Sequence, residues 1–319
     1  MDRGETVRSF FVIFLLFILC SCAKNEARER AEAIDVALSY LSDGECEEAI
    51  KLLEKTGRSQ DAVFLQVLAS AYACRAGFDA VRFISEDIEA IDTDSSQLLN
   101  SLTLLTLSGE TETDSDSYTD LKTAIFLLLN SAKSTQPSQA YRTSTFGPRK
   151  AGDIGVQALL LSIVQLGKFL NHYGNVDANG DKGAGDEANR CFITYSSTDA
   201  QVVAAVGGGV CNGVSSGHVA LNYATAAGRR RLCEGLMLFT NIIDILDNID
   251  VSGNESLSDL EEVADAVKEY KTTAITVDPD LATLLNMTSQ SLCETTLETA
   301  SEMNNMQLIY ASIFESGLQ

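Results

Sequence analysis

Apolar side chains recur with a period near 3.6 residues between Ala31 and Ile91, the spacing that places them on one face of an α-helix. Glycines interrupt this pattern, Gly44 after the first run and Gly57 after the second. The pattern therefore predicts a helix that ends near Gly44, followed by two helices over 45–56 and 60–76 that a short loop joins into an antiparallel hairpin.

Further along the chain, apolar runs predict a series of helices, and strand-like alternation is limited to 191–195 and 201–206. The expected fold class is mostly α. We expect a helical region over 31–133, a linker or loop over 134–150 that holds two of the three prolines, and a C-terminal helical region over 151–319 with an irregular Gly-rich insertion at 174–228. The helices expected after residue 92 cover 98–107, 121–133, 154–172, 234–249, 258–270, 281–287 and 291–314.

The amino terminus has the pattern of an export signal. Arg3 and Arg8 precede the wholly apolar run FFVIFLLFILC at 10–20, which is shorter than the about 20 residues that a membrane-spanning helix needs. A basic start, a short apolar middle and small residues behind it are typical of a secretory signal peptide. We therefore expect a signal peptide over 1–21 and a short tether over 22–30.

The junction Leu19-Cys20-Ser21-Cys22 resembles the lipobox of bacterial lipoproteins. The resemblance implies cleavage before Cys22, a diacylglycerol on its sulfur and an acyl group on the new amino terminus. The alternatives are an ordinary cleaved signal or an uncleaved anchor. Ala23 follows the cysteine, which resembles lipoproteins sent to the outer membrane of diderm bacteria, so the expected location is the cell envelope, outside the cytoplasm.

Six cysteines remain after Cys20 and Cys22 are set aside, and an even number in an oxidising compartment predicts disulfides. Cys46 and Cys74 are nearly equidistant from the predicted hairpin loop, so they face each other and can pair; the alternative is two free buried thiols. The other four cysteines, whose connectivity the sequence leaves open, are Cys191, Cys211, Cys233 and Cys293.

The first helices resemble tetratricopeptide repeats. Small, aromatic and large residues occupy the matching positions over about 60 residues, although the expected Trp and closing Pro are missing. This resemblance implies stacked helix–turn–helix units with a concave binding surface; the alternative is a generic helical bundle. The residues that carry the resemblance are Val36, Ala37, Tyr40, Gly44, Ala49 and Leu53, echoed by Tyr72 and Gly77.

Charge narrows the range of functions. The chain has 45 Asp and Glu against 23 Lys and Arg, a formal net charge of -22, and an acidic protein of this kind repels the phosphates of nucleic acids.

A serine-hydrolase site is excluded by the order of residues. The run Gly213-Val214-Ser215-Ser216-Gly217 matches a hydrolase nucleophile elbow. That triad requires a histidine further along the chain, and no histidine follows His218, so it cannot be completed. We predict no catalytic residues and no enzyme activity.

An Asp/Asn-rich loop is the candidate metal site. Asp177, Asn179 and Asp181 occupy positions one, three and five of a calcium loop, where a hard cation finds its oxygens. Gly183 would supply a carbonyl, and Asp186 or Glu187 a further carboxylate. The alternative is a polar turn that needs no metal.

These features together predict a lipid-anchored, non-enzymatic scaffold whose helices bind another envelope protein. The alternative is a ligand-binding or transport-accessory lipoprotein with an apolar pocket between its helices.

Overall fold

A computed structural model describes residues 26–57, 59–94, 97–108, 115–131, 137–182, 190–195, 217–249 and 258–318. Throughout this part of the chain the regular structure is helical, and the pairing of extended backbone is limited to two isolated bridges, Val176 with Lys182 and Cys191 with Gly217. The all-helical part of the expected fold class is confirmed.

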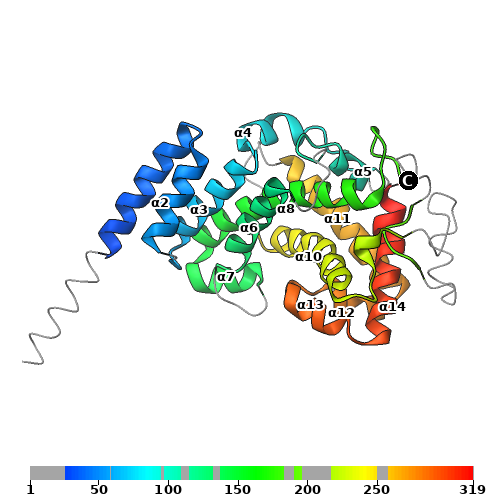
Figure 1. Ribbon diagram of the computed structural model, residues 1–319. Coiled ribbons are helices and arrows are strands. Elements are labelled where there is room, and N and C mark those ends of the chain that lie inside the picture. The colour runs from blue at the N-terminus through cyan, green and yellow to red at the C-terminus, as the bar shows by residue number, and fades with distance from the viewer. Residues whose placement is uncertain are drawn as a thin grey trace, which may run out of the picture.

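The N-terminal helices form one end of an elongated molecule (Figure 1). A helix over 26–42 precedes α2 (Cys46–Thr56) and α3 (Ala62–Arg75), close to the predicted hairpin. Asp61 begins α3 by accepting a hydrogen bond from the backbone N–H of Phe64, which satisfies a donor that would otherwise lack a partner in the first turn. The apolar faces of α2 and α3 are buried against each other and the body.

The predicted tetratricopeptide-like repeats are not confirmed. Between α3 and residue 108, the helical elements of the described residues are the short α4 (Ala80–Arg82), the π-helical turn η1 (Phe83–Asp87) and α5 (Leu98–Thr103). Asp79 caps α4 with its carboxylate, but the segment does not extend into a long second hairpin.

The central element is α8 (Pro148–Gly174), which packs against α3, α5, α6 (Asp116–Leu129), α7 (Gln139–Phe146) and α10 (Ala226–Asn248). It is long and apolar enough to cross a membrane, but 83% of its most apolar window is buried inside the fold. That burial is what the core helix of a folded domain shows, and it accounts for the length of apolar sequence.

The expected linker over 134–150 is wrong in the part that the structure describes, because α7 lies there. Ser138 caps α7, Pro137 precedes that cap, and Pro148 occupies the first turn of α8. Proline is common at the start of a helix, because it lacks an N–H group and the N–H groups of the first turn have no acceptor within the helix. Arg142 of α7 is fully buried and donates to the carbonyl of Leu129 at 3.1 Å, so α7 belongs to the core.

The C-terminal part wraps around α10. Thr225 starts α10 inside the expected 174–228 insertion. The single helix expected over 291–314 is divided, because α13 ends at Thr296 and Thr299 caps the start of the next helix. The elements here are η2 (Val219–Leu221), α11 (Ser258–Val277), η4 (Pro279–Leu281), α12 (Ala282–Leu285), α13 (Gln290–Thr296), α14 (Ala300–Ile309), η5 (Tyr310–Glu315) and η6 (Ser316–Leu318).

The segment 191–195, whose sequence alternates like a strand, forms no strand, and the similar segment 201–206 lies outside the described residues. Cys191 forms only a single bridge to Gly217, while Phe192 and Ile193 are both buried. Side chains on both sides of this segment are therefore buried. The alternation of apolar and polar residues does not correspond to a strand with one buried and one solvent-exposed face.

Two disulfides have both cysteines in the described part of the chain. Cys46–Cys74 joins α2 to α3, as the hairpin geometry predicts, and Cys233–Cys293 joins α10 to α13 across 60 residues of sequence. Cys191 is also disulfide-bonded, whereas Cys211 lies outside the described residues. Closing loops of these lengths stabilises a fold by about 3–4 kcal/mol per bridge.

Candidate functional site

A groove of about 410 Å³ opens between α6, α10 and the start of α13. Its lining combines an apolar surface with charged side chains, so we treat it as the candidate site. Its lining residues are Lys122, Ile125, Phe126, Leu129, Asn130, Pro137, Glu234, Met237, Leu238, Asn241, Thr288, Ser289, Gln290, Ser291 and Glu294.

The apolar lining comes mainly from α6 and α10, two core helices that each carry apolar side chains on the groove side as well as on the core side. On α6, Leu121, Ala124 and Leu128 are fully buried on the core side. The groove side carries Lys122, Phe126 and their neighbours at helical spacing, and the Phe126 ring is 60% exposed. An exposed aromatic beside buried apolar side chains is a surface that can take up an apolar group.

A polar cluster forms one end of the groove around Glu234. The Glu234 carboxylate, only 6% exposed, accepts hydrogen bonds from the Tyr118 hydroxyl at 2.8 Å, the Lys122 ammonium at 2.6 Å and the Arg231 guanidinium at 3.1 Å. Burial raises the pKa of Tyr118 well above its ordinary value, and the charge of Glu234 adds to that shift. The carboxylate is therefore held by three donors at a fixed position.

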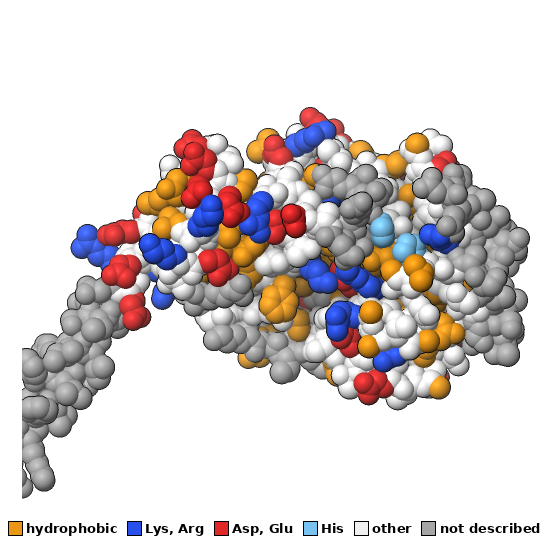
Figure 2. All heavy atoms as spheres, in the orientation of Figure 1, with side chains coloured by type: hydrophobic (Ala, Val, Ile, Leu, Met, Phe, Trp, Pro, Cys, Tyr) orange, Lys and Arg blue, Asp and Glu red, His pale blue; other side chains and the backbone are white. Residues whose placement is uncertain are grey.

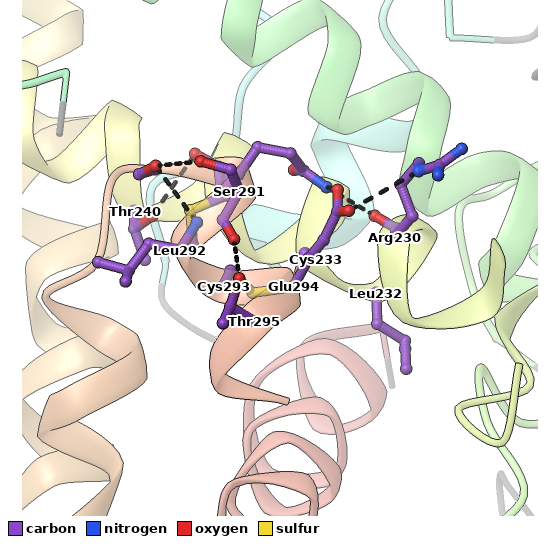
Figure 3. Close-up of a disulfide and its surroundings, with 12 residues drawn as sticks. Arg230, Leu232, Cys233, Thr240, Ser291, Leu292, Cys293, Glu294 and Thr295 are labelled. Atoms are coloured by element: carbon purple, nitrogen blue, oxygen red, sulfur yellow. Dashed lines mark hydrogen bonds and ion pairs between the residues drawn. A yellow bond between two sulfur atoms is a disulfide. The ribbon is translucent and has the colours of Figure 1, made fainter. Parts of the chain in front are cut away.

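The wall formed by the start of α13 is joined to α10 by a disulfide, an ion pair and hydrogen bonds. Figure 3 shows the Cys233–Cys293 disulfide between α10 and α13, with Arg230 and Glu294 facing each other beside it at 3.8 Å. The Gln290 amide donates to the Arg230 carbonyl at 2.9 Å, and the Asn241 amide donates to the Thr288 carbonyl at 3.1 Å. Because this wall is fixed by these contacts, the groove is preformed in the absence of a ligand.

The surface charge is unevenly distributed. Figure 2 shows acidic and basic side chains interleaved over the N-terminal helices, whereas near the middle of the drawn face basic side chains gather beside hydrophobic ones. The sequence predicted an apolar pocket between helices only as an alternative and identified none of these lining residues, because α6, α10 and α13 are far apart in the chain. The available signal was a second apolar stripe, such as Met237 and Leu238 beside Glu234 on α10.

The predicted calcium loop is a tight turn, stabilised by hydrogen bonds from backbone N–H groups to the Asp177 side chain. Asp177 accepts hydrogen bonds from the backbone N–H groups of Asn179 at 2.8 Å and Asp181 at 3.0 Å. Asp181 accepts from the Asn100 amide of α5 at 3.1 Å, and Gly180 has a φ of +83°, which favours glycine. The structure thus brings these three predicted ligands together, while Gly183 and Glu187 lie outside the described residues.

Within the described residues, no group of three or more His, Cys, Asp and Glu side chains is arranged to hold a metal. Calcium in this loop remains a prediction from the sequence. The turn itself is explained by its hydrogen bonds to backbone N–H groups.

Lys182, which occupies the sixth position of that loop, has a different role. Its ammonium is fully buried, 2.7 Å from the Gly174 carbonyl and 2.9 Å from the Glu315 carboxylate. The other Glu315 oxygen accepts from the Phe192 N–H and the Tyr195 hydroxyl, both at 2.7 Å. Burial lowers the pKa of Lys182, and Glu315 partly offsets this effect.

The two histidines lie together in an aromatic cluster with Tyr173, their ring centres 5.4 Å apart. His218 Nδ1 accepts a hydrogen bond from the backbone N–H of Ala220 and so caps η2. Ser215 of the predicted nucleophile-elbow motif lies outside the described residues. What the structure shows of His218 is a packing and capping role.

Comparison with known proteins adds no family or relative: no family model, curated protein or solved structure matches this chain.

Proposed function

We propose that this protein is a non-enzymatic binding protein of the cell envelope, held at the membrane by lipid on Cys22, and that it takes up an apolar ligand in the groove between α6, α10 and α13. The observation that carries this proposal is the 410 Å³ groove, whose lining combines apolar side chains, the 60% exposed Phe126 among them, with the charged Lys122 and Glu234. Its volume falls within the range of about 300–1,000 Å³ that is usual for small-molecule sites.

Two features support the envelope location. The lipobox-like junction ending at Cys22 and the apolar run before it predict export and lipidation. The disulfides at Cys46–Cys74 and Cys233–Cys293 suit an oxidising compartment. The outer membrane of a diderm bacterium is the proposed site, because Ala23 follows the lipidated cysteine.

A protein-interaction scaffold is the second candidate, and the exposed Phe126 side chain is the observation that favours it. Large aromatic side chains in partly enclosed surfaces are common anchors for a partner protein. In this reading the groove receives an apolar side chain of another envelope protein rather than a small ligand.

Cys22→Ala is expected to move the protein from the membrane fraction to the soluble fraction, because the acyl chains on that sulfur supply the anchoring. The measurement is fractionation of cells that produce the full chain, together with mass spectrometry of the mature amino terminus. Cys20→Ala is the matched control and should stay with the membrane. An unmodified Cys22, or a Cys22→Ala chain that still sediments with membranes, would contradict the anchor.

Binding through the groove can be measured with N-phenylnaphthylamine, an apolar dye whose fluorescence rises on leaving water. The full mature chain is exported behind a cleavable signal with Cys22→Ala, so that no detergent competes for the groove. Phe126→Ser should weaken dye binding by about tenfold, the loss expected for one removed apolar contact surface. Val81→Ser, on an exposed α4 side chain remote from the groove lining, should leave binding unchanged.

Equal dye affinities for Phe126→Ser and Val81→Ser would show that the groove is not the binding surface. An absence of saturable dye binding would contradict the ligand-binding function altogether.

A further inference from the structure

We propose that the groove between α6, α10 and α13 binds a neutral amphiphile, an apolar chain with a hydroxyl head group, and that this hydroxyl donates a hydrogen bond to Asn241 Oδ1. This inference rests on the proposed function, because it names the ligand class of the same groove.

An unsatisfied acceptor on the groove lining carries the inference. Asn241 lines the groove and is 1% exposed, yet its Oδ1 has no hydrogen-bond partner among the residues that the structure describes. A buried amide oxygen without a donor is unfavourable, and folded proteins rarely leave one. A ligand that brings a donor into the groove would satisfy it.

The orientation of the Asn241 amide is fixed by its nitrogen. The amide group donates to the Met237 carbonyl at 2.8 Å and to the Thr288 carbonyl at 3.1 Å, so exchanging its nitrogen and oxygen would place an oxygen against two carbonyls. On α10, Asn241 continues the line of Glu234, Met237 and Leu238 at helical spacing, and all four line the groove. Oδ1 is therefore an acceptor left over on the groove side of α10.

Two serines at the start of α13 favour a hydroxyl as the head group. Ser289 follows Thr288, whose carbonyl Asn241 holds, and the hydroxyls of Ser289 and Ser291 lie 3.2 Å apart on the groove lining. Their mutual hydrogen bond uses one of their two protons, so the pair keeps one proton to donate. A ligand hydroxyl can both donate to Asn241 and accept from a serine, whereas an ether or a carboxylate only accepts.

The charged groups of the lining already have partners, which favours a neutral ligand. Lys122 lies 2.6 Å from Glu234, while Glu294 accepts from the Gln290 amide at 2.7 Å and lies 3.8 Å from Arg230. The charged residues of the lining are one cation, Lys122, and two anions, Glu234 and Glu294, a sum of -1. An anionic head group therefore meets no net attraction here.

The apolar part of the lining suits an alkyl chain. Ile125, Phe126 and Leu129 of α6 contribute to it, together with Met237 and Leu238 of α10. The Phe126 ring is 60% exposed, so an alkyl chain that covers it removes apolar surface from water.

The test compares two isomers that differ in the hydrogen-bond donor. 1-Decanol and methyl nonyl ether contain the same atoms, but the ether oxygen can only accept. Each competes with N-phenylnaphthylamine for the exported Cys22→Ala chain, and decanoate supplies the anionic head group for comparison. Decanol should displace the dye at a concentration about tenfold lower than the ether, because the ether leaves Asn241 Oδ1 unpaired. Decanoate should compete less well than decanol.

Asn241→Leu tests the assignment of the acceptor. The leucine is similar in size but has no oxygen, so decanol should lose its advantage over the ether. Asn248→Leu is the matched control and should retain the advantage, because Asn248 also lies on α10 and donates to a backbone carbonyl, that of Asp244, but is exposed and outside the groove lining. Should Asn241→Leu fail to fold, the comparison of the two isomers on the chain with Asn241 intact still decides.

The outcomes separate the two proposals. If the dye does not bind saturably, the groove is no ligand site and the proposed function fails with this inference. If the dye binds in a Phe126-dependent manner but decanol competes no better than the ether, the groove stands and the hydroxyl head group is overturned. Stronger competition by decanoate than by decanol, or an advantage of decanol that survives Asn241→Leu, would also overturn it.

Discussion

Lys182→Met is expected to lower the free energy of unfolding by about 3–5 kcal/mol, because it leaves the buried Glu315 carboxylate without its cation. The two side chains are 0% and 1% exposed, with 2.9 Å between ammonium and carboxylate. Denaturant unfolding followed by circular dichroism measures the change. The midpoint of thermal unfolding should fall by about 2–4 °C for each kcal/mol in a chain of this size.

Lys51→Met supplies the control for that experiment. Lys51 pairs with Glu47 and Glu48 on the surface and is 58% exposed, so its replacement should change the free energy of unfolding far less than Lys182→Met does. Replacing both partners, as Lys182→Met with Glu315→Leu, should recover part of the loss because no lone charge then remains buried. A Lys182→Met chain as stable as the Lys51→Met chain would contradict the buried pair.

Stability is expected to fall by about 4 kcal/mol for each pH unit above about pH 10, because three buried tyrosines resist ionisation in the folded state. Burial is the largest cause that raises the pKa of Tyr118, Tyr195 and Tyr310 well above the ordinary value. The unfolded chain loses these protons near pH 10 and the folded chain does not, so this contribution is complete below pH 10 and is lost as the pH rises.

Two buried cations act with the opposite sign, Lys182 over a narrow interval and Arg142, whose pKa burial lowers to about 10; burial raises the pKa of Tyr270 to about 12, which offsets the effect of Arg142. Burial lowers the pKa of Lys182, so the folded state releases that proton first and gains stability as the pH rises, until free lysine also deprotonates near pH 10.4. A single lysine contributes about 1.4 kcal/mol per pH unit, against about three times as much from the tyrosines. The net slope above pH 10 is therefore a loss of stability.

The ultraviolet absorbance of tyrosinate checks this prediction, and the absence of tryptophan keeps the signal simple. The buried tyrosines should ionise in one cooperative step that coincides with the loss of helical circular dichroism. Tyr118→Phe should reduce the alkaline slope by about one third, whereas Tyr141→Phe, on a side chain that is 45% exposed, should not change it. If every tyrosine ionised gradually near pH 10 while the helices stayed intact, the predicted burial of these tyrosine hydroxyls would be wrong.

Local patterns in the sequence determined the helices and one disulfide. The 3.6-residue period and the glycine at 57 placed α2 and α3 to within about two residues, and that hairpin brings Cys46 opposite Cys74. Export is a prediction from the sequence alone, because a signal peptide is recognised as a linear pattern. Where local signals were misjudged, as with the prolines around α7, the caps were present but were interpreted as loop residues.

Only the tertiary structure decided the groove, the Cys233–Cys293 bridge and the role of Lys182. Residues of the groove come from α6, α10 and α13, which are far apart in sequence. By sequence, Lys182 belongs to the predicted calcium loop, whereas its partner Glu315 is supplied by the C-terminal turn. The physical reason is that periods and caps act over a few residues, whereas burial and ion pairing depend on which distant faces the whole chain packs together.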